Sequence, residues 1–97
     1  MAGATFHPLA ERELIDAARY YELESPGLGA SFLDAAERCE HEIIEYPNAG
    51  TKIRGEVRRR LLRAFPYALL YRIHPDGIRI LAVMNLKRRP FYWTGRE

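Results

Sequence analysis

Residues 65–85 read FPYALLYRIHPDGIRILAVMN, and this stretch decides the fold. Its apolar side chains recur at every second position, namely Tyr67, Leu69, Tyr71 and Ile73, then Ile78, Ile80, Ala82 and Met84. A period of two is that of a β-strand, whose successive side chains point to opposite faces of a sheet. Pro75-Asp76-Gly77 lies between the two runs and has typical turn residues. The stretch therefore predicts two antiparallel strands joined by a tight turn.

The same period begins one segment earlier, at residues 57–62. On a strand, Arg58 and Arg60 project together and Arg59 projects to the opposite side. A row of guanidiniums on an exposed sheet face is suited to binding phosphates or carboxylates through paired hydrogen bonds. We therefore take Arg58 and Arg60 as candidate binding residues. The alternative is a solvated edge or face with no partner.

The N-terminal half has helical periodicity instead. Apolar residues recur at spacings of three and four over residues 14–21 and again over residues 32–46. Pro8 suits the first position of the earlier helix, and Ser25-Pro26-Gly27 separates the two helices. Two helices with so short a link predict an antiparallel αα-hairpin.

A short strand is also expected at residues 4–6, and a loop at residues 48–55. The predicted element order is then β-α-α-β-β-β, within one domain spanning residues 1–97. Strands that are segregated from helices indicate the α+β class. We expect an antiparallel sheet with the αα-hairpin packed on one face.

The composition, 47% hydrophobic and 29% charged, is typical of a soluble globular chain. No apolar run approaches the ~20 residues that span a bilayer, and no signal peptide is visible, so we expect a cytoplasmic protein without a membrane partner. The single Cys39 excludes an internal disulfide, and its place in an apolar helical stripe predicts burial. His41 and Glu42 begin the zinc-protease pattern H-E-x-x-H, but the second histidine is missing. No metal and no cofactor are expected.

The formal net charge is only +2, but the charges are unevenly distributed. Most acidic residues lie within residues 11–46, and most basic residues lie within residues 52–96. This asymmetry predicts a basic face that meets an acidic partner.

The most concentrated basic stretch comes directly after the predicted last strand. It consists of Lys87, Arg88 and Arg89, followed by Pro90, Phe91, Tyr92 and Trp93. Cations beside aromatic surface suit a binding function, including one that faces nucleic acid. The aromatic side chains either stack on bases or close a thin core. We favour packing for Trp93 and a functional contact for Arg88 and Arg89.

Several motifs occur together in order along the chain. They are F-x-x-x-A at residues 6–10, A-x-x-Y-Y at 17–21, P-G-L-G-x-x-F at 26–32, V-R-R-x-L-L-x-x-F-P-Y-x-L-x-Y-x-I at 57–73 and I-L-A-V-M-x-x-x-R-R-P-x-Y-W at 80–93. In this order and spacing they resemble the RelE/ParE superfamily, the toxins of bacterial type II toxin–antitoxin pairs. The resemblance covers nearly the whole chain and implies the same β-α-α-β-β-β fold.

The superfamily divides by target. RelE-like members are ribosome-dependent mRNA endonucleases, and for that activity the resemblance implies catalytic roles for Arg58, Arg60, Arg88 and Tyr92. Arginine is a poor general base because its pKa is very high. Ala68 also stands where RelE-type nucleases carry an arginine.

The FPY and RRPxYW segments are more similar to the ParE-like branch, whose members poison DNA gyrase. This implies a binding toxin without catalytic residues, and whether the chain is an enzyme stays open because of the RelE-like alternative. The implied target-binding residues are Arg58, Arg60, Lys87, Arg88, Arg89, Tyr92 and Trp93. A third alternative is a degenerate, non-toxic member that only binds antitoxin.

The resemblance also implies a partner. This is a cognate antitoxin whose amphipathic, acid-bearing segment wraps the αα-hairpin and the sheet, in a heterodimer or a higher hetero-oligomer. The target is DNA gyrase in the ParE-like reading and ribosome-bound mRNA in the RelE-like reading.

Overall fold

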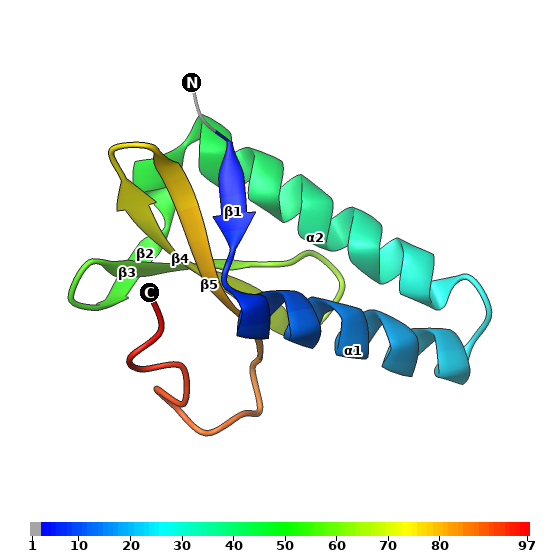
Figure 1. The fold of residues 1–97 in the computed structure, drawn as a ribbon. Coiled ribbons are helices and arrows are strands. Elements are labelled where there is room, and N and C mark those ends of the chain that lie inside the picture. Colours follow the sequence, from blue (N-terminus) through cyan, green and yellow to red (C-terminus); the bar gives the residue numbers. More distant parts are fainter. Residues whose placement is uncertain (1–2) are drawn as a thin grey trace.

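The computed structural model describes residues 3–97. Its elements are β1 (Ala4–Phe6), α1 (Pro8–Glu24), α2 (Leu28–Glu45), the 3-10 turn η1 (Pro47–Ala49), β2 (Thr51–Arg54), β3 (Val57–Leu61), β4 (Tyr67–His74) and β5 (Gly77–Asn85). The two helices form an antiparallel hairpin that packs against a five-stranded sheet (Figure 1). The predicted α+β class, with an αα-hairpin on one sheet face, is confirmed.

The sheet differs from the expectation in two details. Its strand order is β1-β5-β4-β3-β2, and β1 pairs with β5 in parallel, so the sheet is mixed rather than purely antiparallel. A fifth strand, β2, occupies part of the predicted loop and pairs antiparallel with β3. Only Ile53 of β2 is partly buried, so this edge strand lacks the alternation that would reveal it in the sequence.

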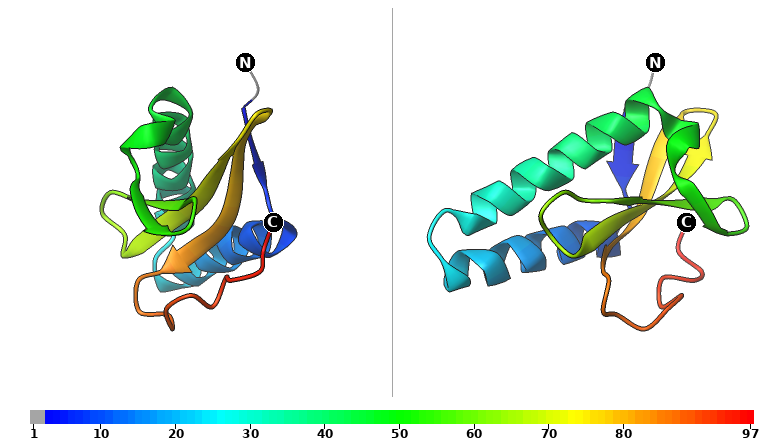
Figure 2. Two further views of the ribbon diagram at one scale, coloured as in Figure 1. Left: turned by 90° about the vertical axis from the view of Figure 1, so that its left-hand side faces the viewer. Right: turned by 180° about the vertical axis from the view of Figure 1, so that it is seen from behind.

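The link between the helices depends on one acidic side chain and one glycine. The Glu22 carboxylate accepts hydrogen bonds from the backbone N–H groups of Gly27 and Gly29, both at 3.1 Å. A Cβ at Gly29 would lie 2.7 Å from the carbonyl oxygen of Ala18, so a side chain there would push the helices apart. The two helices are therefore close together near the connecting loop, and they diverge toward the other end of the hairpin (Figure 2).

The two central strands are buried on both faces of the sheet. Ala68, Leu69, Leu70 and Tyr71 of β4 are all 0% exposed. Leu69 and Tyr71 pack under the helices in a cluster with Phe32, Ile43 and Ile80. Ala68 and Leu70 pack on the opposite side, which we call the open face, in a cluster with Val57, Leu81, Ala82 and Trp93.

Cys39 belongs to the cluster under the helices, as its position in the apolar stripe predicts. It is 2% exposed, and its thiol lies 3.7 Å from the carbonyl oxygen of Arg60. Burial raises the pKa of the Cys39 thiol to about 12, which keeps it protonated and unreactive near neutral pH.

Within residues 3–97, neither helix combines the length and the apolar character that crossing a bilayer requires. The same residues contain no group of three His, Cys, Asp or Glu side chains placed to hold a metal ion. Glu42, from the incomplete zinc pattern, instead forms ion pairs with Arg60 and Arg63.

Candidate functional site

The basic aromatic segment lies in residues 86–97, which follow β5 and contain no helix or strand. We call residues 86–97 the tail. Figure 2 shows this tail, in red, returning along the sheet on the side away from α2. Local turns shape it, because Arg88 N–H donates to the Asn85 carbonyl at 2.9 Å and Thr94 N–H donates to the Phe91 carbonyl at 3.0 Å. Trp93 is 4% exposed and closes the cluster on the open face. The packing interpretation of Trp93 is thus confirmed, and its role in target binding stays a prediction.

A second anchor holds the end of the tail to α1. Arg96 forms a two-pronged ion pair with Glu13, with Nη1–Oε1 and Nη2–Oε2 distances of 3.1 and 3.0 Å. Glu13 also accepts the backbone N–H of Val83 at 3.0 Å, and Arg96 also donates to the carbonyl of Leu81 at 3.1 Å. The partners lie 83 positions apart in the sequence, so no local pattern could have identified this pair.

Two guanidiniums lie close to the ring of Tyr92. The Arg88 guanidinium carbon is 4.0 Å from the Tyr92 ring centroid, and that of Arg96 is 5.1 Å from it. Burial raises the pKa of the Tyr92 hydroxyl above its ordinary value, and the nearby Glu13 carboxylate raises it further. The hydroxyl makes no hydrogen bond of good geometry within residues 3–97. Tyr92 is therefore a cation-stacking ring and a weak proton donor.

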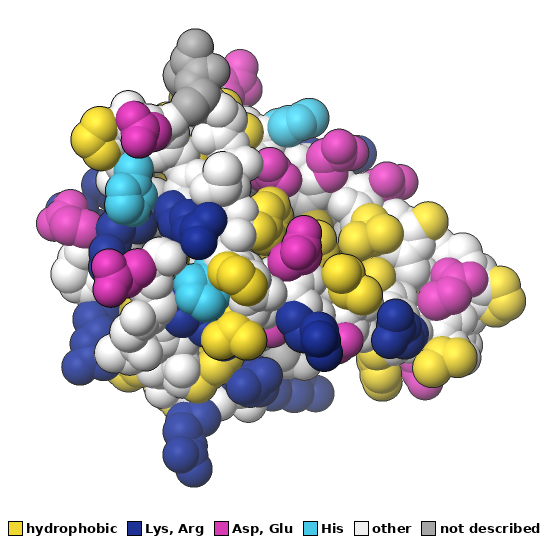
Figure 3. Space-filling view, in the orientation of Figure 1, with side chains coloured by type: hydrophobic (Ala, Val, Ile, Leu, Met, Phe, Trp, Pro, Cys, Tyr) yellow, Lys and Arg dark blue, Asp and Glu magenta, His cyan; other side chains and the backbone are white. Residues whose placement is uncertain are grey.

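Lys87, Arg88 and Arg89 are exposed at the start of the tail. Within the part of the chain that the structure describes, none of the three forms an ion pair. Figure 3 shows Lys and Arg side chains gathered toward the sheet and the tail, whereas hydrophobic and acidic side chains share much of the visible surface of the helix hairpin. These three cations are free to meet an acidic partner.

Arg58 and Arg60 occupy a different place from the one that the sequence predicts. They lie on the helix-covered side of β3, opposite Tyr71 and Leu69 of β4. Arg58 donates to the carbonyl oxygens of Asn48 at 3.1 Å and Gly50 at 2.8 Å. The expected row on an exposed sheet face is therefore wrong, because the αα-hairpin and the η1 turn cover the face to which these side chains point.

Arg60 is also held by another residue of the chain. Its Nε donates to Glu42 Oε1 of α2 at 3.1 Å, and the two side chains are only 28% and 25% exposed. Of the residues implied for nuclease activity, only Arg88 and Tyr92 touch each other. The structure does not assemble Arg58 and Arg60 with that pair.

The open face instead presents Arg59 beside an apolar groove. The groove has a volume of about 400 Å³. Apolar side chains of β2, β3, β5 and the tail line it, and two arginines, Arg59 and Arg88, also contribute to its lining. Leu61, Leu86 and Phe91 in it are 53%, 43% and 44% exposed. Sequence reasoning missed this groove because its walls come from four separate segments.

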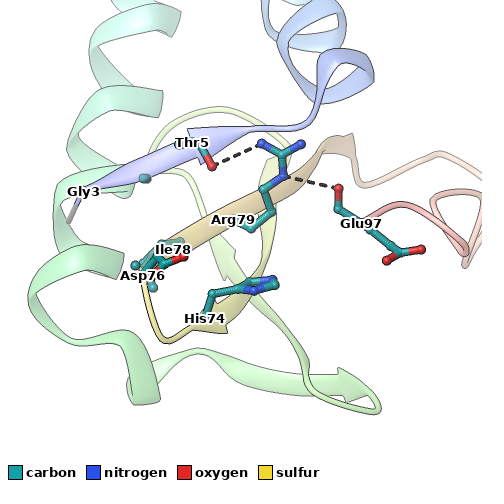
Figure 4. A pocket seen from close by; sticks show the side chains of 9 residues that line it. Gly3, Thr5, His74, Asp76, Ile78, Arg79 and Glu97 are labelled. Atoms are coloured by element: carbon teal, nitrogen blue, oxygen red, sulfur yellow. Dashed lines mark hydrogen bonds between the residues drawn. The ribbon is translucent and has the colours of Figure 1, made fainter.

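A cavity of about 410 Å³ lies at the other end of the sheet, beside the β4–β5 turn (Figure 4). Its cation, Arg79, already donates to Thr5 Oγ1 at 3.1 Å and to the Glu97 carbonyl at 3.3 Å. His74 lines this cavity without a hydrogen bond to Arg79, Thr5 or Glu97 in the structure (Figure 4). The side chain of Arg79 is therefore already held by neighbouring residues of the chain.

Comparisons with known proteins agree with the fold described above. Residues 4–90 match the family described as the ParE toxin of the type II toxin–antitoxin system parDE. A solved structure described as the chromosomal ParDE toxin–antitoxin system from P. aeruginosa superposes with a TM-score of 0.67 and 18% sequence identity, covering 88% of this chain and 96% of that one. At this identity the superposition shows a shared fold. Comparison with curated protein sequences gave no match.

Proposed function

The chain belongs to the ParE toxin family of type II toxin–antitoxin systems, and from this we propose that it poisons DNA gyrase and is neutralised by a cognate antitoxin. The observation that carries the proposal is the exposed cation cluster of Lys87, Arg88 and Arg89 on a tail anchored by Trp93 and Arg96. Such a cluster on a rigid base suits binding to an acidic protein surface or to DNA held by a protein.

The chemistry of the site favours binding over catalysis. A metal-independent nuclease needs a general base, a general acid and cations that converge on one phosphate. In this chain Arg58 and Arg60 are held by carbonyl oxygens and by Glu42, away from Arg88. The buried Tyr92 hydroxyl, with its raised pKa, is poorly suited to donate a proton. These facts support a gyrase-binding toxin rather than an mRNA endonuclease.

The exposed apolar side chains of the two helices support an antitoxin partner. Large apolar side chains on the helices are exposed, including Tyr20 at 57% and Leu23 at 83%. A permanent partner would cover such surface and add to the stability of so small a protein. We propose a heterodimer or a higher hetero-oligomer with the antitoxin, located in the cytoplasm with its target.

The test is induction of the chain in bacterial cells, with and without the product of the adjacent reading frame. We expect filamentous cells and a DNA-damage response while protein synthesis continues, and we expect co-expression of the adjacent product to restore growth. Purified gyrase mixed with the chain should accumulate cleaved DNA. Immediate arrest of translation with codon-positioned mRNA cuts would establish the RelE-like alternative. Harmless expression with retained antitoxin binding would establish the non-toxic alternative.

A further inference from the structure

The groove on the open face combines two properties that rarely coexist on an unpartnered surface. Its floor is apolar, with Leu61, Leu86 and Phe91 each more than two-fifths exposed. Its cations, Arg59 and Arg88, form no ion pair within residues 3–97. A volume of about 400 Å³ is within the range of specific binding pockets.

Phe91, at the edge of the groove, is held in place by its neighbours. Its backbone lies in the left-handed region with φ of 62°, which is uncommon and strained for a bulky residue. The ring is held edge-on to Trp93 at 5.9 Å, and the Arg54 guanidinium lies 4.4 Å above its centroid. An exposed aromatic ring held in a strained conformation by its neighbours indicates a surface prepared for a ligand.

We propose that this groove receives an acidic segment of the antitoxin that carries a bulky apolar anchor side chain. The anchor packs between Leu61 and Phe91, and flanking carboxylates pair with Arg59 and Arg88. This inference rests on the proposed function, because it names where the antitoxin binds.

Other occupants fit the groove less well. A second copy of the chain, packed symmetrically, would bring Arg59 and Arg88 against their own counterparts, which places like charges together. Single-stranded nucleic acid stacks on aromatic rings, but this floor is mainly aliphatic, with Phe91 its single exposed ring. A target that is met only intermittently would leave Leu61 and Leu86 exposed most of the time, whereas an antitoxin bound continuously covers them.

Arg88 connects the groove with the proposed target-binding surface. Arg88 lines the groove and also belongs to the exposed cation cluster of the tail. An antitoxin segment seated in the groove would therefore occupy one of the residues that the toxin is proposed to use against its target. Antitoxin and target would then compete for the same end of the molecule.

The experiment measures the affinity of the purified chain for the product of the adjacent reading frame. Leu61→Asp places a carboxylate in the groove, and we expect it to weaken binding at least about tenfold, the ratio that corresponds to roughly 1.4 kcal/mol. Ile73→Asp is the matched control, since Ile73 is 41% exposed at the far end of β4, and it should bind like the unmodified chain. Thermal melts of each variant check that folding is retained.

A second pair of variants tests the charge component. Arg59→Gln should weaken binding and reduce its dependence on salt concentration, whereas Arg38→Gln on α2 should change neither. If Leu61→Asp and Arg59→Gln both bind as tightly as the unmodified chain, the groove is not the antitoxin site, although the proposed function stands. If the unmodified chain itself does not bind the adjacent product, the proposed function fails and this inference fails with it.

Discussion

Arg58 and Arg60, on the helix-covered face of the sheet, are held differently from Arg54 and Arg88, on the open face and in the tail. On the helix-covered face, Arg60 pairs with Glu42 and Arg58 donates to carbonyl oxygens of the η1 turn. On the open face and in the tail, Arg54 lies over the ring of Phe91 and Arg88 lies over the ring of Tyr92. The hydrogen-bond donors of Arg58 and Arg60 have acceptors within the chain. The aromatic rings orient Arg54 and Arg88 but leave their hydrogen-bond donors available.

Arginines held in the first way contribute to the fold, and arginines held in the second way are available to bind a partner. A guanidinium held by a carboxylate or by carbonyl oxygens contributes to the fold, and removing it alters stability. A guanidinium held by an aromatic ring keeps its charge exposed, so removing it alters binding. Four predictions test this comparison, in order of their expected effect on the free energy of unfolding.

The largest effect is expected from Trp93→Ala. This side chain closes the core on the open face and is 4% exposed, so its loss should lower the free energy of unfolding by about 3–5 kcal/mol. Denaturant unfolding of the chain or of its antitoxin complex measures the change. Phe91→Ala, which removes a ring that is 44% exposed, should cost far less. If Trp93→Ala and Phe91→Ala lowered the free energy of unfolding equally, the buried cluster on the open face would have no special role in stability.

The next effect is expected from Glu13→Ala. The change removes the partner of Arg96 and the acceptor of the Val83 N–H, and the Arg96 and Glu13 side chains are only 12% and 16% exposed. We expect a loss of about 2–3 kcal/mol, because hydrogen bonds to charged groups are stronger than neutral ones and Arg96 is left unpaired. Glu24→Ala on the same helix is the control and should stay within about 0.5 kcal/mol. A stable Glu13→Ala variant would mean that Trp93 alone anchors the tail.

A smaller effect is expected from Glu42→Ala on the helix-covered face. The Arg60–Glu42 pair is about a quarter exposed, so solvent weakens it, and we expect a loss of about 1 kcal/mol. Arg63, which is 73% exposed in its own pair with Glu42, should be replaceable by alanine with almost no change. Thermal melts at low and high salt measure both variants. A large loss with Arg63→Ala would show that the exposed pair has a structural role.

The smallest effect on stability, and the largest on function, is expected from the double change Arg88→Ala and Arg89→Ala. Both residues are exposed and form no ion pair within residues 3–97, so unfolding should change by no more than about 0.5 kcal/mol. Toxicity in growth curves should nevertheless be lost. The double change Arg12→Ala and Arg38→Ala on the helices is the control. A folded double variant that remains fully toxic would mean that Arg88 and Arg89 are exposed to solvent and do not contact the target.

Much of the fold could be predicted from local sequence. The helical spacing of apolar residues predicted both helices, and Ser25-Pro26-Gly27 marked the break that separates α1 from α2. Pro75-Asp76-Gly77 predicted the turn between β4 and β5. Burial of Cys39 and Trp93 was also predicted. Each of these features depends on residues close together in the chain, where propensity and periodicity act directly.

The candidate site was harder to predict. The exposed cations of the tail were found because Lys87, Arg88 and Arg89 are consecutive in the sequence. The groove was missed because its walls come from β2, β3, β5 and the tail, and the β2 edge strand itself has no periodic signal. The tail anchor was missed because Glu13 and Arg96 are 83 positions apart and are ordinary surface residue types in sequence.

Alternation along the chain is enough to predict which residues share a face of the sheet, and the motifs are enough to indicate the family. Which face the helices cover depends on packing between distant parts of the chain. In β3, alternation separates Arg58 and Arg60 from Arg59, but the pattern is the same whichever side the helices take. In β4, apolar residues occupy both sides, so no polar side marks the solvent. The choice depends on how α2, the η1 turn and the tail pack on the sheet, and those contacts join residues that are distant in the chain.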